Sequence, residues 1–445
     1  MQRREFLTRV GLAGGALALG RFDAVQAADT SGYKSLVCVF LLGGNDAFNM
    51  VVPRSAAEYR VYAAARQNLA VPASALLPIT PLTSDGAQYG LHPAMRELQT
   101  LFQSGRAAIV ANVGPLVQPA TKAEIAARSV PLPPQLFSHN DQQDQWQSLR
   151  GLANFTTGWA GRVADALEAQ LASQRVPLNI SLAGTLPWQA ATRASGYAVG
   201  DQGPVTYLTL ESAVPGGIAR RRAFEALVAS RQPTPYGRAL NRAHERALAL
   251  ASLTQQALTR APRLATTFPD TPLGRQLAMV ARLISVRDEL AMRRQIFLVA
   301  IGGFDTHDAQ NELQPGLLGG VSAALASFDA ALRELQVENA VTTFTMSEFS
   351  RTLTSNGDGT DHGWGGHQLV IGGAVRGGDI YGAMPRLEIN GPDDMGGGRI
   401  IPTRSVQQFA ATLLKWFGLN DAELDSVVTG LQRFATRDLG FMRTA

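Results

Sequence analysis

The chain has 445 residues, of which 45% are hydrophobic and 17% charged, so it can bury a large core and is not disordered. Its formal net charge is only +4, and half of it comes from residues 1–27, so the composition gives no support to a nucleic-acid-binding protein. The single cysteine, Cys38, excludes a disulfide framework and any cysteine-based zinc or iron–sulfur site.

The first 27 residues have the order of an export signal. The paired arginines Arg3 and Arg4 precede a Gly/Ala-rich apolar run at 10–20, and Val25-Gln26-Ala27 is a small-residue cleavage pattern. The arginine pair favours the twin-arginine pathway over an ordinary secretion signal. The apolar run is shorter than the roughly 20 residues that span a bilayer. We therefore predict a periplasmic or secreted protein that meets the twin-arginine export machinery and keeps no stable membrane anchor.

Four short apolar runs in the mature chain each end in glycine or polar residues, as buried parallel strands do. They cover residues 35–42, 107–113, 295–301 and 341–346. Helical periodicity lies between and around them, at residues 93–103, 142–149, 158–171, 238–260, 273–292, 317–335 and 405–417. Residues 176–215 resemble short strands and loops. The alternation predicts an α/β fold with a mostly parallel sheet flanked by helices, in a single domain over 28–445.

Polar side chains collect at the predicted strand ends, where open parallel sheets bind their ligands. The candidates are Asp46, Asp305, His307, Glu348, and three residues of the Gly-rich loop at 356–367, namely Asp361, His362 and His367. His139 stands before a predicted helix and is a further candidate. Carboxylates mixed with imidazoles suit a divalent ion, with zinc as the first choice and manganese or calcium as alternatives. Glu348 could instead pair with Arg351.

Ser138 is the candidate nucleophile. A hydroxyl before a helix lies beside free backbone N–H groups that would stabilise a phosphate or sulfate oxyanion. The competing interpretation is a plain helix cap, in which the side chain only bonds the backbone three residues on. The sequence has no Gly-x-Ser-x-Gly elbow, no phosphate-binding loop of the Gly-x-x-x-x-Gly-Lys type and no Gly-x-Gly-x-x-Gly after the first strand. These absences argue against the α/β-hydrolase fold and against nucleotide-binding and dinucleotide-binding folds.

Together these segments resemble one family. The marks are the twin-arginine start, Phe40-Leu-Leu-Gly-Gly-Asn-Asp46, Leu91-His-Pro93, Phe137-Ser-His-Asn-Asp-Gln-Gln143, Thr157-Gly-Trp-Ala-Gly-Arg162, Gly303-Phe-Asp-Thr-His307, Ser347-Glu-Phe-Ser-Arg351, the loop at 356–367 and Gly372-Gly-Ala-Val-Arg-Gly-Gly378. The chain is similar to the exported domain-of-unknown-function family fifteen-oh-one. That family is grouped with the alkaline phosphatase and sulfatase superfamily.

The resemblance implies a metal site and a nucleophile that attacks phosphorus or sulfur. Asp46 resembles the superfamily's first-strand metal aspartate, and Ser138 is the best match for its nucleophile. The later ligands would be Asp305, His307, Asp361, His362 and His367. Glu348 stands where the superfamily's strand-end aspartate is expected, which leaves two alignments open for this region, and His139 has no clear counterpart and would be an extra ligand. The spacing of Asp305 and His307 is tighter than the superfamily pattern, and Cys38 lies inside a strand and excludes a modified-cysteine nucleophile.

The predicted function is an exported, metal-dependent hydrolase of phosphate or sulfate esters, on a small-molecule or polymer substrate. The alternative is a non-enzymatic exported protein that keeps the fold and binds a glycan, a surface polymer or a protein partner. Fold analogy supports the reaction class only as an analogy. Convergence of the named side chains in space would favour the enzyme, and scattered side chains would favour the alternative.

Overall fold

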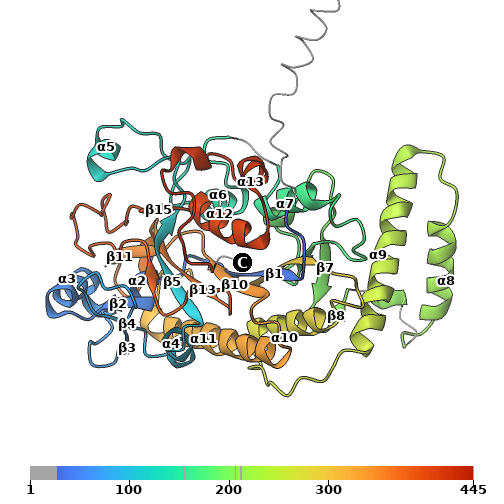
Figure 1. Cartoon of the computed structure of the whole chain (residues 1–445), viewed down its shortest axis with the longest axis horizontal. Coiled ribbons are helices and arrows are strands. Elements are labelled where there is room, and N and C mark those ends of the chain that lie inside the picture. Colours follow the sequence, from blue (N-terminus) through green and yellow to red (C-terminus); the bar gives the residue numbers. More distant parts are fainter. Residues whose placement is uncertain (1–27, 154–155, 206, 211–212, 444–445) are drawn as a thin grey trace, which may run out of the picture.

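The computed structural model describes residues 28–153, 156–205, 207–210 and 213–443 (Figure 1). The predicted export signal at residues 1–27 lies outside the described residues. The central element is one large sheet. Its strands, in spatial order, are β14 (Ile380–Tyr381), β5 (Ala107–Gly114), β13 (Gly366–Ile371), β10 (Val341–Met346), β1 (Lys34–Leu41), β9 (Arg294–Ile301), β6 (Asn179–Ser181), β7 (Tyr197–Gly200) and β8 (Gly203–Pro204), and β15 (Arg404–Ser405) also pairs with β5.

The sheet is mostly parallel, which confirms the predicted α/β class. β1 pairs in parallel with both β9 and β10, and β6 continues the parallel order beyond β9. The four predicted strands correspond to β1, β5, β9 and β10. β13 was not predicted, and it runs antiparallel between β10 and β5. Because it is reversed, its first residues lie where its neighbours have their carboxyl ends.

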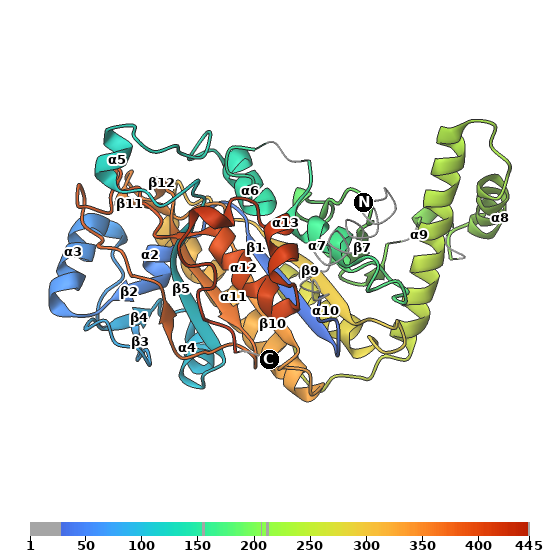
Figure 2. The same cartoon turned by 45° about the horizontal axis from the view of Figure 1, so that its top comes forward.

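Helices cover both faces of the sheet (Figures 1 and 2). They are α2 (Ala47–Met50), α3 (Ala56–Arg66), α4 (Arg96–Gln103), α5 (Lys122–Ala126), α6 (His139–Ser148), α7 (Trp159–Leu167), α8 (Gly217–Val228), α9 (Pro235–Thr259), α10 (Pro272–Ser285), α11 (Gln310–Glu334), α12 (Val406–Phe417) and α13 (Asp421–Val427). Two small sheets complete the fold, β2 (Val51–Pro53), β4 (Tyr89–Leu91) and β3 (Leu77–Ile79) in one and β11 (Arg351–Ser355) and β12 (Thr360–His362) in the other.

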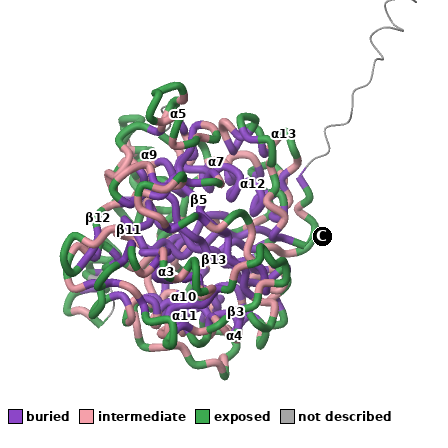
Figure 3. Tube along the Cα trace, turned by 90° about the vertical axis from the view of Figure 1, so that its left-hand side faces the viewer, coloured by how far each residue is buried: buried purple, intermediate pink, exposed green. Residues whose placement is uncertain are grey.

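The alternation of side chains along β1 builds a separate core on each face of the sheet. Val37 and Val39 belong to the core formed with α4, α10 and α11, whereas Cys38 and Phe40 belong to the core formed with α7, α12 and α13. The buried residues run through the middle of the molecule in Figure 3. Burial also raises the pKa of the Cys38 thiol, so this residue is an apolar core member.

α11 is the one helix among the described residues that is long and apolar enough to cross a membrane. Half of its apolar stretch is buried, and its buried side chains, such as Leu318 and Phe328, belong to the core shared with α10. We therefore interpret α11 as a core helix, because a buried core helix can be as long and as apolar as a membrane-spanning one.

One local prediction was wrong. The Gly-rich segment at 356–367 was expected to be a loop, yet it contains β12 and the start of β13. β12 pairs with β11, and Arg351 is opposite His362 in that pair. This pairing fixes His362 on a strand, which matters for the site described next.

Candidate metal centre

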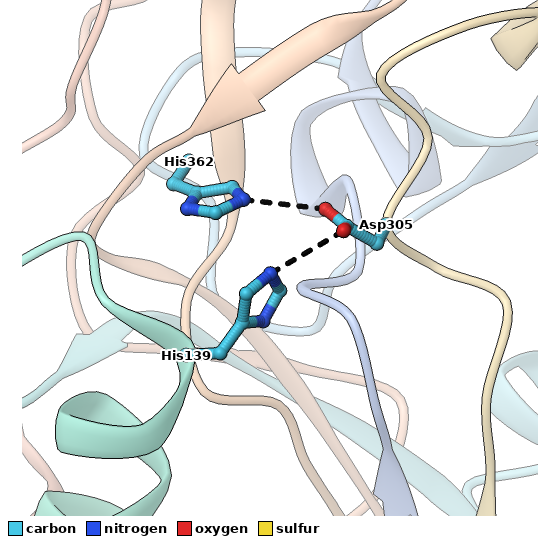
Figure 4. A group of neighbouring side chains, drawn as sticks. All are labelled: His139, Asp305 and His362. Carbon is cyan, nitrogen blue, oxygen red and sulfur yellow. Dashed lines mark ion pairs between the residues drawn. The ribbon is translucent and has the colours of Figure 1, made fainter.

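Three side chains from distant parts of the chain converge beside the carboxyl ends of the parallel strands (Figure 4). Asp305 follows β9, His139 is the first residue of α6, and His362 is the last residue of β12. One ligand atom from each of the three lies within 4.8 Å of the others. The arrangement agrees with the rule that open parallel sheets build their sites at this edge.

Both imidazoles turn their Nε2 atoms toward the Asp305 carboxylate. His139 Nε2 lies 3.4 Å from Oδ2 and His362 Nε2 lies 3.3 Å from Oδ1. The other nitrogen of each ring is held from behind. His139 Nδ1 is 2.9 Å from Glu348 Oε1, and His362 Nδ1 is 2.7 Å from the Phe137 carbonyl oxygen. Because those oxygens can accept a hydrogen bond, a neutral ring with its proton on Nδ1 would present its Nε2 lone pair to the cluster.

Asp305 is kept ionised. Partial burial opposes its ionisation, but the hydrogen bond and the charge of Arg351 outweigh that cost and lower the pKa of the carboxyl group. Arg351 Nη1 lies 2.6 Å from Oδ1, and the guanidinium is itself fixed because it donates to the carbonyl oxygens of Gly43 and Thr360. The sequence left Arg351 as a possible partner of Glu348. The structure pairs it with Asp305 instead, which only the folding of the loop could show.

The environments of the two histidines move their pKa values in opposite directions. The hydrogen bond to Glu348 raises the pKa of His139, whereas burial lowers the pKa of His362. Phe349 stacks on the His362 ring with 4.7 Å between centroids and also contacts His139. The two rings are thus clamped in one orientation by an aromatic side chain and by their Nδ1 partners.

His307 and Asp361, both predicted ligands, border this group on its exposed side. His307 Nε2 lies 3.1 Å from Asp305 Oδ1 and 3.0 Å from His362 Nε2. Its Nδ1 is 3.3 Å from Asp361 Oδ1, so Asp361 supports His307 and reaches the cluster through it. The His307 side chain is 40% exposed, which leaves it accessible to a molecule arriving from solvent.

Glu348 lies behind the cluster and is fully buried. Its Oε1 accepts from the Gly43 N–H at 2.9 Å and from the Gln143 amide at 2.9 Å, besides the His139 contact. Its Oε2 is buried and has no hydrogen-bond partner among the described residues. A buried carboxylate oxygen is costly when left alone. Glu348 thus places one buried carboxyl oxygen without a hydrogen-bond partner beside the cluster.

The structure does not bring Asp46 to the cluster. Its Oδ1 accepts from the backbone N–H groups of Phe48 and Asn49, as the N-cap of α2. Its Oδ2 pairs with the buried Arg66 guanidinium and accepts from the Gln310 amide at 2.5 Å. Protein donors occupy both carboxylate oxygens of Asp46, so its role in this structure is to stabilise the fold.

His367 also lies apart from the cluster. Its side chain is buried against the edge of Phe48, and its Nδ1 accepts the Asn112 N–H at 3.1 Å. Burial lowers the pKa of this imidazole to about 3, which keeps it neutral. It occupies the start of the reversed strand β13, a direction that the sequence pattern did not reveal.

Ser138 caps α6 directly before His139. Its hydroxyl donates to Asp141 Oδ2 at 2.8 Å and accepts weakly from the Asp141 N–H at 3.5 Å. This is the geometry of the cap interpretation, with an added carboxylate partner. Asp141 was not considered from the sequence, although its position three residues after a cap serine is the usual place for such a partner. The cap and the nucleophile roles are compatible, since Asp141 is positioned to take the hydroxyl proton.

The cluster fits a divalent cation. Two imidazole Nε2 atoms and an ionised carboxylate face one another, and with the ring protons on Nδ1 all three would offer lone pairs to one positive ion. Two histidines and one carboxylate, each histidine held by an outer hydrogen-bond partner, are typical of zinc sites that keep a position open for substrate. Glu348 would compensate part of the ion's charge from behind.

The sequence matches the family described as "Protein of unknown function (DUF1501)" over residues 33–438. The chain belongs to this family. The matched range includes every residue of the cluster, from His139 to His362. A search of curated protein sequences gives no significant match.

Among the solved structures, three show a weak similarity to this chain. PsFucS1 sulfatase from Pseudoalteromonas sp. is 9% identical, with a TM-score of 0.35 over 95% of this chain and 73% of that chain. Ps i-CgsB in complex with k-i-k-neocarrahexaose gives 9% identity and 0.32, over 88% and 74%. The lipooligosaccharide phosphoethanolamine transferase A from Neisseria meningitidis gives 8% and 0.34, over 94% and 60%. Similarity at this level carries no information on the activity of this chain.

Proposed function

We propose that this protein is an exported, metal-dependent hydrolase of phosphate or sulfate esters. The observation that carries the proposal is the convergence of His139, Asp305 and His362, with both Nε2 atoms directed at an ionised carboxylate. These three residues would hold one divalent ion, with zinc as the first choice on the chemistry of the donors. When bound, such an ion polarises a phosphoryl or sulfuryl oxygen as a Lewis acid.

The chain's own groups supply the other parts of the reaction. Ser138 Oγ would form the new bond to phosphorus or sulfur as the bond to the ester oxygen breaks, and its proton would pass to Asp141, which already accepts it at 2.8 Å. The accessible His307, supported by Asp361, would give a proton to the leaving oxygen. Arg351 keeps Asp305 ionised and in position.

Export remains part of the proposal and rests on the arginine pair, the apolar run and the cleavage pattern of residues 1–27. The twin-arginine pathway carries folded proteins, which would allow an ion to be bound before export. Fractionation of cells that express the whole chain would test this. We expect the mature protein in the periplasm or the medium, and an Arg3→Lys/Arg4→Lys variant to stay in the cytoplasm.

The experiment that tests the activity measures metal content and the turnover of aryl phosphate and aryl sulfate esters by the purified mature protein. Asp305→Asn should abolish stoichiometric metal and turnover together. Asp308→Asn is the matched control, because Asp308 is an exposed aspartate three residues away with no part in the cluster. Normal metal content in Asp305→Asn, or a metal-loaded wild type that turns over neither ester class, would remove the support for this function.

A non-enzymatic metal-binding protein is the second candidate. It is favoured by the position of Asp46, because this aspartate, which the family resemblance assigns to the metal, is fully engaged by Arg66 and Gln310. Ser138→Ala separates the two candidates. If the protein is an enzyme with Ser138 as nucleophile, the variant should lose turnover and retain its metal. Unchanged turnover in the variant would assign the nucleophile to another residue. No turnover in either the wild type or the variant would favour the binding protein.

A further inference from the structure

A pair of helices, α8 and α9, projects from the end of the molecule next to β8 and away from the helices that cover the sheet (Figures 1 and 2). α9 is anchored by its carboxyl-terminal end, where Thr254, Ala257 and Leu258 are buried. Leu250 and Leu253 also pack against the core and Arg246 contacts Ser195, so the part of α9 before Arg246 extends for about 16 Å at 1.5 Å per residue. Of the 12 residues of α8, only Gly217 and Val228 are buried.

The end of this pair, residues 226–244, is here called the hairpin tip. It exposes three large apolar side chains: Leu227 is 62% exposed, Tyr236 is 88% exposed and Leu240 is 58% exposed. Single exposed leucines are ordinary on protein surfaces. Three large apolar groups at one projecting end are not, because each leaves apolar area in water that a binding partner would cover.

The same tip is basic, with the acidic residues Glu225 and Glu245 just outside its two ends. It contains Arg231, Arg238 and Arg242 and no acidic residue, and all three arginines are exposed. Within the part of the chain that the structure describes, none of the three forms an ion pair. Arg238 donates to the Pro233 carbonyl at 2.9 Å, and Asn241 donates to the Ser230 carbonyl at 3.0 Å, so the loop between the helices is held in place. The tip thus presents charge and apolar area in a fixed arrangement.

We propose that the hairpin tip binds reversibly to an anionic lipid bilayer surface. Tyrosine and leucine side chains partition into the interface between headgroups and acyl chains, while arginines beside them attract the anionic headgroups. The arginines argue against a second copy of the chain, because two tips in a symmetric contact would bring like charges together. The apolar groups argue against a purely anionic polymer, which would leave Leu227, Tyr236 and Leu240 without a partner. This peripheral contact differs from a stable anchor, and it is independent of the proposed ester hydrolysis.

Co-sedimentation of the mature protein with vesicles tests the proposal. Vesicles of phosphatidylcholine with one third phosphatidylglycerol should bind the wild type at low salt, and pure phosphatidylcholine vesicles should bind it at least about tenfold more weakly. The apolar variant Leu227→Ser/Tyr236→Ser/Leu240→Ser and the charge variant Arg231→Gln/Arg238→Gln/Arg242→Gln should each lose binding by about tenfold or more.

The matched control is Arg60→Gln/Arg96→Gln/Arg433→Gln, which removes the same charge from exposed positions outside the tip. It should bind as the wild type does. Far-UV circular dichroism of every variant shows that the remainder of the protein is folded, and because this measurement needs no bound metal, a failure of this proposal stays distinct from a failure of the proposed function.

Four results would overturn the proposal. In the first, the wild type does not bind phosphatidylglycerol vesicles at low salt, and in the second, the control loses as much binding as the charge variant. In the third, the apolar variant binds phosphatidylglycerol vesicles as the wild type does and also binds a soluble anionic polysaccharide as the wild type does. In the fourth, the wild type is a dimer in solution and the apolar variant is a monomer. The third result would assign the tip to anionic polymers, and the fourth to self-association.

Discussion

Asp46 and Asp305 follow two neighbouring parallel strands, β1 and β9, and yet they have opposite surroundings. Asp46 is buried, caps a helix and is saturated by Arg66 and Gln310. Asp305 is 43% exposed and faces imidazole nitrogens. Position at the carboxyl end of a strand is therefore shared by a structural carboxylate and by a candidate metal ligand, and the partners of each oxygen separate the two.

The first difference lies in the local chain. After β1 a turn over residues 42–46 leads into α2, and Asp46 stands at its N-cap, so its side chain is used by the first N–H groups of that helix. After β9 the chain stays irregular until α11 begins at Gln310, which leaves Asp305 free to meet side chains from α6 and β12. The irregular segment after β9 thus leaves Asp305 free to contact side chains from distant segments, whereas the backbone N–H groups of α2 occupy Asp46.

The largest effect on stability is expected when the buried group of Asp46, Arg66 and Gln310 is disrupted. Asp46→Asn keeps a cap residue but leaves the Arg66 charge buried without its carboxylate, and the removal of one member of a buried pair costs about 3–5 kcal/mol. Urea unfolding of the metal-free protein measures this. The double variant Asp46→Asn/Arg66→Met should recover most of the stability. A variant with unchanged stability and lower metal content would instead return Asp46 to the metal site.

A substitution in the cluster of His139, Asp305 and His362 should change metal binding and leave the stability of the metal-free protein nearly unchanged. His362→Ala removes one nitrogen ligand, and we expect at least about a hundredfold weaker metal binding with little change in the unfolding of the metal-free protein, because the ring is partly exposed. Titration with zinc and competition by a chelator measure the affinity. His244→Ala, on α9, is the control and should bind metal normally. Equal affinities of the two variants would contradict the assigned ligand set.

The strands and most helices were predictable, because their apolar periodicity is local; β1, β9 and β10 match the expected ranges within a residue or two. The site was predictable only in part. Asp305 and His307 are identified from their place after a strand, His362 from the Gly-rich loop at 356–367, and His139 from its place before a helix. The roles of Asp46 and His367 depend on Arg66, Gln310 and the reversal of β13, which are contacts across 20 to 264 residues of chain that no local pattern contains.

A fall in pH should lower the stability of the folded protein through the buried imidazole of His367. Its folded-state pKa is lowered to about 3, below the ordinary value of 6.5, so the neutral form contributes stability that is complete above about pH 6.5. As the pH falls from 6.5 toward 3, the unfolded chain binds a proton that the folded chain does not. The resulting loss is about 1.4 kcal/mol per pH unit for this group. His92, whose pKa burial lowers to about 4, should add to it.

Urea unfolding at about pH 7.5 and about pH 5 tests this prediction. From 6.5 to 5, His367 alone should account for about 2 kcal/mol of lost stability. His367→Gln removes the titrating group, so its stability should fall less between the two pH values, whatever its stability at neutral pH. An equal fall in the variant and the wild type would mean that the imidazole is not buried in its neutral form.

The smallest effect is expected behind the open site, at Glu348. Glu348→Gln keeps the shape of the side chain and an oxygen that can accept from His139 Nδ1, but it removes the negative charge next to the ring. Outer hydrogen-bond partners of metal-binding histidines are worth about tenfold to a hundredfold in affinity, and a retained amide oxygen places the expected loss near about tenfold. The pKa of His139 should fall as well, because the bond to Glu348 is the main cause of its increase. A zinc titration and the NMR titration of His139 in the metal-free protein measure the two changes. If zinc affinity fell while the pKa of His139 stayed constant, Glu348 would act on the ion directly through its unpaired Oε2 rather than through the imidazole.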